Sequence, residues 1–351
     1  MTKLYVFNPE HDLALASNLS NFTAPHAGRK LRSDLGHIPA LWAGEGDYIL
    51  VDDVERAVRA YGRLRAKVGG TPKQFVDKSQ LNRLIINKVE PWGWDPAMRS
   101  FLLRHGVDAA ILPSEDQLAA IRDLSHRKQA VALLRELQLP GTIGSSACAD
   151  TIPEVRKALD NFGHIVVKAP WSSSGRGVRF VKQTLDDYQE RWMKNVIEKQ
   201  QCVVVEPYYN KVKDFGMEFE SDGNGSVRYL GLSLFHTKNG AYTGNLIASE
   251  QEKMKLLSDY IPECLITTVQ EKICAFMGGL LQGKYQGPFG VDMMVVAKED
   301  RTGFLLHPCV EINLRRTMGH VALAIPPFAD GFTRVMHVAF TDKYRLSVRK
   351  R

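Results

Sequence analysis

A lysine at the end of an apolar segment is followed directly by a loop of serines and glycines, Lys168-Ala-Pro-Trp-Ser-Ser-Ser-Gly-Arg-Gly-Val178. Small residues let backbone N–H groups approach an anion closely, and serine hydroxyls add further donors. With the charges of Lys168 and Arg176, the segment suits a diphosphate or triphosphate. It is not a P-loop, because no Gly-Lys-Ser/Thr follows, and a strand rather than a helix follows Gly175-x-Gly177, unlike a Rossmann fingerprint. A plain flexible hairpin is the alternative.

A second group of polar residues falls on two consecutive predicted strands, 289–297 and 304–313. If Asp300 pairs with Gly303 across a type I turn, the register places Asp292 opposite Glu311 and Asn313 opposite Gly290. Two facing carboxylates repel, so one should be protonated unless a cation lies between them. Oxygen ligands beside an amide suit Mg²⁺ bound partly through substrate phosphates. The alternative is an acidic pair neutralised by Arg315 or Arg316.

A third segment, Glu206-Pro-Tyr-Tyr-Asn-Lys-Val-Lys-Asp214, follows the apolar strand predicted at 202–206. Pro207 ends the ladder of hydrogen bonds, and the free backbone groups beyond it could bind the edge of an adenine. Asp214 could hold the hydroxyls of a ribose. An ordinary loop is the alternative.

These groups need a scaffold, and the pattern of apolar residues predicts an α/β unit followed by mixed elements. In the first part we expect strands at 4–8, 48–52 and 107–112 and a helix at 53–67, which alternate as in a parallel sheet. Capping boxes predict helices that begin after Ser114 and Thr151. Three strands are predicted at 165–169, 178–182 and 202–206, and a helix capped by Thr184–Asp187 separates the last two. A helical region at 249–283 is broken at Pro262.

The composition is that of an ordinary globular protein: 351 residues, of which 44% are hydrophobic and 24% charged. The length predicts two or three domains. Five cysteines without metal-binding spacing indicate reduced thiols of a cytoplasmic protein. No run approaches the ~18 apolar residues of a membrane helix, so no membrane partner is expected. A net charge of +7 favours nucleic acid or small anions, but the basic residues at 343–351 suggest a solvated tail, and no recognition motif accompanies them, so nucleic acid is the weaker reading.

In their order and spacing, the three groups resemble the ATP-grasp superfamily over about residues 115–330. The most specific element is Glu311-Ile-Asn313-Leu-Arg315, which is most similar to the biotin-carboxylase-like and carboxylate–amine ligase members. The resemblance implies an α/β and α+β architecture. We expect an N-terminal α/β (pre-ATP-grasp-like) domain at 1–113, an ATP-grasp subdomain with a phosphate lid at 114–205, and a C-terminal ATP-grasp subdomain with the metal site at 206–351.

The resemblance also implies a nucleotide site. Lys168 would contact the phosphates and take part in catalysis, and Glu206 would read the adenine amino group. Asp214 would hold the ribose, although the family usually has Glu there and a shorter hinge. Arg127 lies where the family often has a first phosphate-binding lysine. Backbone contacts from the hinge and the lid over the phosphates would come from Tyr208, Tyr209, Ser172, Ser173, Ser174, Gly175, Arg176 and Gly177.

The implied metal ligands are Asp292, Glu311 and Asn313, which would hold two Mg²⁺ or Mn²⁺ ions, and Arg315 would steady the transferred phosphoryl group. The implied reaction is phosphorylation of a small carboxylate by ATP, followed by attack of an amine or similar nucleophile on the acyl phosphate. An ATP-grasp kinase of a small molecule and a non-catalytic nucleotide-binding protein are the alternatives. The substrates are unnamed by the sequence, and a homodimer is compatible with it.

The segment Asn8-Pro-Glu-His-Asp12 directly follows the first predicted strand. Because ligands of open α/β sheets lie beyond the carboxyl ends of the strands, these residues could line a substrate pocket. Turn and capping chemistry is the alternative. A basic stretch follows that could recognise an acidic substrate or simply be solvated, and it consists of His26, Arg29, Lys30 and Arg32.

Overall fold

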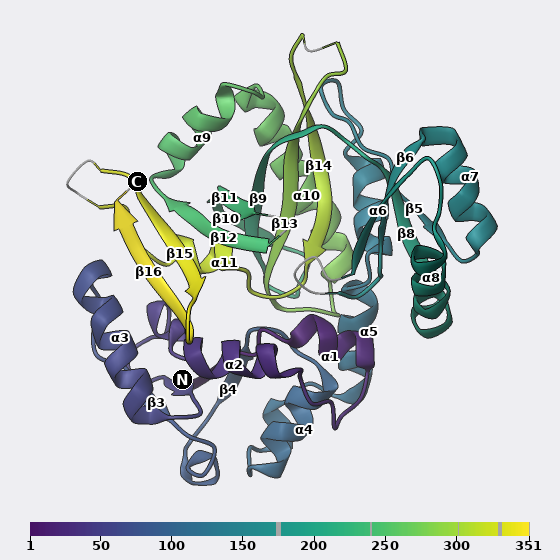
Figure 1. Ribbon diagram of the computed structural model, residues 1–351. Helices are drawn as coiled ribbons and strands as arrows, with labels where there is room; N and C mark the ends of the chain where they lie inside the picture. The colour runs from purple at the N-terminus through teal and green to yellow at the C-terminus, as the bar shows by residue number, and fades with distance from the viewer. Residues whose placement is uncertain (173–176, 239–240, 301, 329–331, 351) are drawn as a thin grey trace.

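The computed structural model describes residues 1–172, 177–238, 241–300, 302–328 and 332–350, which form four four-stranded sheets with helices packed around them (Figure 1). The architecture is α/β and α+β, as the sequence predicts.

The N-terminal sheet is parallel, with the strand order β3-β2-β1-β4. Its strands are short and largely buried, as is usual for a parallel sheet. The strands are β1 (Lys3–Val6), β2 (Tyr48–Leu50), β3 (Gln74–Val76) and β4 (Lys88–Pro91), and the helices around them are α1 (His11–Ser17), α2 (His26–Leu35), α3 (Val54–Val68) and α4 (Pro96–Arg104).

The strand predicted at 107–112 is wrong. Residues Ala109–Ile111 form a short 3-10 helix, capped by Asp108, whose side chain accepts a hydrogen bond from the Ala110 N–H. Val107 and Leu112 are nevertheless buried in the core of this sheet. Burial alone therefore explains the apolar pattern, and it does not distinguish a strand from a short helix.

The second sheet carries the lysine and the hinge acid. It is antiparallel, with the order β5-β8-β6-β7, and two helices bury its apolar side chains. Its strands are β5 (Ala147–Ala149), β6 (His164–Lys168), β7 (Val178–Lys182) and β8 (Val203–Pro207), and its helices are α7 (Ile152–Phe162) and α8 (Asp187–Gln200). The predicted capping box at Thr151 is confirmed, whereas α8 is capped by Asp186 with Gln189 rather than by Thr184.

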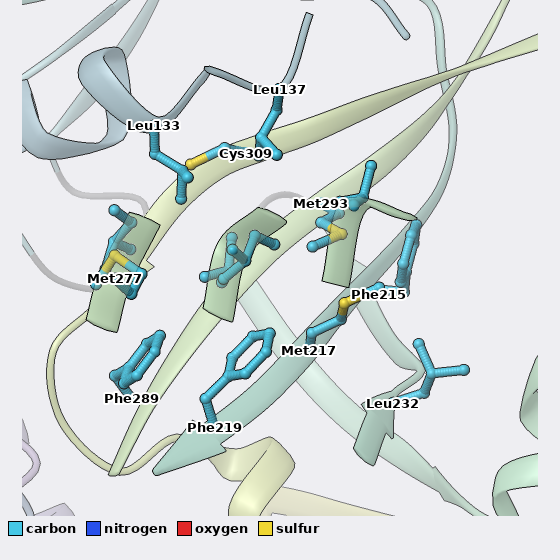
Figure 2. Close-up of a cluster of buried hydrophobic side chains, with 14 of the residues drawn as sticks. Leu133, Leu137, Phe215, Met217, Phe219, Leu232, Met277, Phe289, Met293 and Cys309 are labelled. Atoms are coloured by element: carbon cyan, nitrogen blue, oxygen red, sulfur yellow. The ribbon is translucent and has the colours of Figure 1, made fainter. Parts of the chain in front are cut away.

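The third sheet holds the largest hydrophobic cluster and has the order β10-β9-β13-β14. Phe219 and Phe289 stack in it with ring centroids 5.1 Å apart. Leu133 of α6, Leu137 directly after α6, and Met277 of α10 also contribute to this cluster (Figure 2). Its strands are β9 (Lys211–Ser221), β10 (Val227–Ser233), β13 (Gly287–Ala297) and β14 (Phe304–Asn313). The helices are α5 (Glu115–Leu124), α6 (Lys128–Glu136), α9 (Glu250–Ser258) and α10 (Glu263–Leu281).

Helix α10 is long and apolar enough, by length and composition alone, to cross a membrane. In this structure its side chains Ile266, Val269, Ile273 and Met277 are buried in the cluster of the third sheet. One face of the helix therefore packs against the core of the third sheet.

The basic C-terminus is a strand, not the tail that the sequence suggested. In the fourth sheet, of order β11-β12-β15-β16, β16 (Tyr344–Lys350) pairs with β15 (Arg334–Phe340) and contacts α2 and α3 (Figure 1). The other strands are β11 (Phe235–Lys238) and β12 (Ala241–Ile247), and α11 (Met318–Leu323) packs beside β12. The Tyr344 N–H donates to Asp34 of α2 at 2.8 Å, which ties this sheet to the N-terminal helices.

We predict that Phe289→Ala lowers the free energy of unfolding by about 3–5 kcal/mol, because the side chain is 0% exposed and its loss leaves a cavity beside Phe219. Phe162→Ala is the matched control. Phe162 is 50% exposed, so its loss should change stability by only about 0.5 kcal/mol. Urea denaturation of both variants measures the difference, and equal effects would contradict the assigned core.

Candidate nucleotide and metal site

The hairpin of β13 and β14 places two carboxylates face to face. Asp292 pairs with Glu311 and Gly290 with Asn313, which confirms the predicted register at these positions. The Asn313 side-chain amide donates to Asp292 Oδ2 at 3.1 Å. The three predicted metal ligands therefore lie together on one face of the hairpin.

The predicted pairing of Asp300 with Gly303 across the turn, from which that register was derived, is wrong. The Gly303 carbonyl accepts a hydrogen bond from the Lys298 N–H at 2.9 Å, and Phe304 pairs with Ala297. Near the turn, Gly303 therefore bonds to Lys298 and not to Asp300. An irregularity of β14 opposite Met293 then shifts the register back. It contains Pro308, which has no N–H to donate and which strands tolerate at bulges.

Burial and the neighbouring acids disfavour the charged form of Asp292. Burial, followed by repulsion from Glu311 and Glu218, raises the pKa of Asp292 to about 8. Without a cation, Asp292 is therefore mainly protonated at neutral pH, as two facing carboxylates require. Oxygen donors of this kind fit a hard divalent cation, which would release that proton on binding.

Glu218 is a buried acid of this site that the sequence reasoning missed. It lies on β9, pairs with Gly290, and is only 2% exposed. Its Oε2 lies 2.9 Å from Nδ1 of His320 but has no hydrogen-bond partner among the described residues, because that nitrogen accepts from the Thr317 N–H. A signal was present, since Glu218 falls between Met217 and Phe219 in an alternating segment, but no strand was predicted there.

Lys168 and Glu206, which were predicted to contact opposite ends of a nucleotide, form one buried ion pair. Their charged atoms lie 2.6 Å apart, and the residues are 7% and 6% exposed. Lys168 also donates to the carbonyl of Val310 at 3.2 Å, inside the irregular part of β14, and Ser146 donates to Glu206 at 3.3 Å. These contacts join the end of β8, which carries Glu206, to β14, which carries the predicted metal ligands Glu311 and Asn313.

Arg127, at the start of α6, links the lid segment to the metal ligands. One guanidinium nitrogen donates to the Ala169 carbonyl and to Ser172 Oγ, the latter at 2.9 Å, and the other donates to Glu311 Oε1 at 2.6 Å. The side chain is buried. Its charge therefore lies between the base of the serine loop and the acidic pair, where phosphate oxygens would need it.

Arg315 is held by the N-terminal part of the chain. Its Nε donates to Asp12 Oδ1 at 3.0 Å and its Nη2 donates to Oδ2 at 2.7 Å, which is a bidentate pair. Burial alone would raise the pKa of Asp12, but the Arg315 guanidinium lowers it below the usual value. His11, Asp12, Arg127, Glu311 and Asn313 border one small cavity.

The rest of the Asn8–Asp12 segment makes structural contacts. Asn8 donates to the Gly93 carbonyl at 2.8 Å, and His11 Nδ1 lies 3.2 Å from Asp95. These bonds fasten the start of α1 to the loop after β4. Of the five residues, only His11 and Asp12 border the small cavity beside the acidic pair.

The remaining predicted nucleotide contacts have other partners within the protein. The Tyr208 N–H donates to His164 at 2.9 Å, so it is not free for an adenine, and the two rings stack 4.0 Å apart. Tyr209 packs edge-on against His307. Asp214 accepts from Thr237 at 2.9 Å and pairs with Lys211 at 2.6 Å.

The predicted lid lies partly outside the described residues. Ser172 and Gly177 are described, and the Gly177 carbonyl accepts from the Ala169 N–H at 2.8 Å. Ser173, Ser174, Gly175 and Arg176 lie outside them. Within the described ranges, no three His, Cys, Asp or Glu side chains form a metal-binding group by themselves. An ion between Asp292 and Glu311 would therefore draw further ligands from Asn313 and from phosphate oxygens.

No protein-family model matches this chain. No curated protein matches it either. Solved structures do. N5-carboxyaminoimidazole synthetase from Staphylococcus aureus, complexed with ADP, is 13% identical with a TM-score of 0.52, covering 97% of this chain and 82% of its own.

Two further structures are similar over nearly the whole chain. A putative ATP-grasp superfamily protein from Archaeoglobus fulgidus is 11% identical with a TM-score of 0.51, covering 100% of both chains. The biotin carboxylase domain of the Hydrogenobacter thermophilus 2-oxoglutarate carboxylase, a dimer with MgADP, ADP and bicarbonate, is 14% identical with a TM-score of 0.50, covering 96% of this chain and 74% of its own. At such identities the similarity is one of fold.

We predict that Lys168→Met and Glu206→Gln each lower the free energy of unfolding by about 3–5 kcal/mol, because each leaves one buried charge without its partner. The double variant should lose clearly less than the sum of the two. The exposed pair of Arg59 and Glu55 is the control, where the same cycle should be additive within about 0.5 kcal/mol. Denaturant unfolding gives all the values, and additivity at Lys168 and Glu206 would argue against a coupled pair.

A second prediction concerns pH. Between about pH 4, where an exposed Asp titrates, and about pH 8, the folded metal-free protein keeps a proton on Asp292 that the unfolded chain has released. Stability should therefore fall as pH rises through this window. Asp292→Asn has no such proton, so its stability should fall less, whereas Glu299→Gln, an exposed acid of the same hairpin, should behave as the parent. Urea unfolding in chelator at several pH values tests this, and equal slopes for all three proteins would refute it.

Proposed function

We propose that this chain, which has the ATP-grasp fold, is an Mg²⁺-dependent ligase that activates a carboxylate as an acyl phosphate for attack by an amine. The observation that carries the proposal is the facing pair of Asp292 and Glu311 with Asn313 bonded to it. ADP in the solved structure of the Staphylococcus aureus synthetase and MgADP in that of the Hydrogenobacter thermophilus carboxylase domain support the choice of nucleotide and metal.

The residues present fit a divalent cation. Asp292, Glu311 and the Asn313 amide offer oxygen donors. Glu218 adds a buried carboxylate nearby, whose Oε2 accepts no hydrogen bond from the described residues. When bound, the cation supplies positive charge between these carboxylates and the phosphate oxygens. The rest of the catalytic machinery belongs to the chain itself.

Arg127 and Lys168 would bind the phosphates. Both are buried, and both contact the strand of the acidic pair, Arg127 through Glu311 and Lys168 through the Val310 carbonyl. Their side chains are already oriented before the nucleotide arrives. Fixed charges of this kind stabilise the transferred phosphoryl group without reorganising during the reaction.

Arg315 would orient the acyl phosphate. Its Nε and Nη2 donate to the Asp12 carboxylate, and its Nη1 donates to the Arg316 carbonyl. A guanidinium held this way has little rotational freedom, so its charge stays directed at the acidic pair. In this arrangement the N-terminal sheet, through Asp12, sets the position of a residue that acts on the phosphoryl group.

Calorimetry of ATP binding with Mg²⁺ and with chelator tests the nucleotide part of the proposal. ATP should bind tightly only with the divalent cation, because without it no cation links the carboxylates of Asp292 and Glu311 to the phosphate oxygens. ATP binding of equal affinity in chelator would contradict the assignment.

A turnover screen tests the reaction. ADP release is measured with Mg²⁺–ATP over amino acids, dipeptides and small polycarboxylates. A ligase releases ADP and phosphate together with a joined product. A phosphorylated product without free phosphate would indicate a kinase, and ATP binding without turnover on any substrate would leave a nucleotide-binding protein.

We predict that Glu311→Gln abolishes turnover and removes the stabilisation by Mg²⁺–ATP, which for the parent reaches about 2.7 kcal/mol at a ligand concentration 100 times the Kd. Glu299→Gln, in the same hairpin but exposed, is the control and should keep both. Melting curves with and without Mg²⁺–ATP, and one turnover assay, give the result. A Glu311→Gln protein that turns over near the parent rate would refute the metal site.

A further inference from the structure

A second cavity, of about 530 Å³, lies at the carboxyl ends of all four strands of the N-terminal sheet. It is lined by segments that follow each strand, including Asn8 after β1, Asp52 after β2, Lys78 after β3 and Asp95 after β4. The strand order β3-β2-β1-β4 reverses between β1 and β4, and parallel sheets bind ligands outside such a reversal. The volume is within the range of small-molecule sites, about 300–1,000 Å³.

The start of α1 separates this cavity from the nucleotide and metal site. Glu10 and Ala14 line the N-terminal cavity, whereas His11 and Asp12 border the small space beside Glu311. The two sites are therefore distinct, although consecutive residues of the chain form the wall between them.

Glu10 is the polar group of this cavity that lacks a full set of partners. It is 8% exposed, its Oε1 accepts from Arg32, and its Oε2 has no hydrogen-bond partner among the described residues. Burial raises the pKa of Glu10 above its usual value, although Arg32 opposes the shift. A buried carboxylate with a free oxygen loses its hydration, which a hydrogen-bond donor on a ligand would replace.

The outer lining of the cavity has mixed charge with a small positive excess, because Arg29, Lys78 and Arg104 outnumber Asp52 and Asp77. Arg29 and Lys78 are exposed there and form no ion pair among the described residues. The lining also includes apolar side chains, among them Leu50, Met98 and Phe101. The cavity thus offers a buried acid, an apolar wall and exposed cations in excess over exposed acids.

We propose that this cavity binds a small zwitterion with an apolar body, such as an apolar amino acid or dipeptide. Its ammonium group donates to Glu10, and its carboxylate lies against Arg29 and Lys78. The binding does not rest on the proposed ligase function. The same chemistry belongs to an amine substrate of the reaction or to an effector, and turnover distinguishes these two sources.

The first experiment is calorimetry without nucleotide, using L-phenylalanine, L-leucyl-L-leucine and two analogues of the dipeptide. N-acetyl-L-leucyl-L-leucine lacks the ammonium group, and L-leucyl-L-leucinamide lacks the carboxylate. Saturable binding of the zwitterions, weakened at least about tenfold by each analogue, is the expected result. No saturable binding of either zwitterion, or equal binding of the analogues, would overturn the proposal.

Two variants test which residue binds each end of the ligand, and a third is the control. Glu10→Gln should weaken L-leucyl-L-leucine at least about tenfold and leave the N-acetyl analogue unchanged. Arg29→Gln should weaken the dipeptide but not its amide, and because Arg29 is exposed this variant remains informative if Glu10→Gln unfolds. Glu55→Gln, an exposed acid of α3 outside the cavity, is the matched control and should bind as the parent. Unchanged affinity in both Glu10→Gln and Arg29→Gln would reject the site.

A turnover assay with Mg²⁺–ATP then separates the sources. An amine substrate is consumed with release of ADP, whereas an effector changes the rate on another substrate and is recovered intact. Because binding is measured without ATP, a chain that binds the dipeptide but never uses ATP supports this cavity and refutes only the ligase.

Discussion

Two half-buried carboxylates face each other across the β13–β14 hairpin, and the repulsion between Asp292 and Glu311 is the constraint on which the surrounding structure depends. Each relieves part of it differently. Glu311 pairs with Arg127. Asp292 accepts a hydrogen bond from the Asn313 amide alone within the described part of the chain, and its pKa is raised to about 8. Glu218 is buried beside them, and its repulsion adds to the raised pKa of Asp292. A divalent cation between the carboxylates would remove this repulsion.

Two arginines connect the strand of this acidic pair to other parts of the chain. Arg127 joins Glu311 to the segment that begins the serine loop, and Arg315 joins the end of β14 to Asp12. A bidentate pair between a guanidinium and a carboxylate specifies orientation as well as distance. The position of the N-terminal sheet is therefore part of the geometry of the site, and β16 against α2 and α3 holds the same parts together from the opposite end of the chain.

The short segment before and within α1 is placed where two binding regions meet. Asn8 and His11 fasten it to the loop after β4, Asp12 reaches Arg315, and Glu10 faces the N-terminal cavity. Asn8 and Glu10, which precede the helix, thus line the N-terminal cavity, whereas His11 and Asp12, the first two residues of α1, border the space beside Glu311.

What the sequence determined by itself was local. The alternation of apolar residues predicted the hairpin of β13 and β14 almost to its ends, and the boxes at Ser114 and Thr151 predicted where two helices begin. These signals depend on neighbours a few residues away, so they survive without a tertiary structure. The pairing of Asp292 with Glu311 was predicted correctly although the turn was not, because the irregularity near Pro308 offsets the difference.

Only the tertiary structure decided which charges meet and how deeply they are buried. Lys168 pairs with Glu206, Arg315 with Asp12 across most of the chain, and Glu218 joins the acidic pair from a strand that the sequence did not predict. The apolar run at 107–112 was buried as expected but formed no strand, and the basic C-terminus formed one. The physical reason is that backbone periodicity is encoded within a segment, whereas the partner of a long charged side chain and the burial that sets its pKa depend on segments hundreds of residues away.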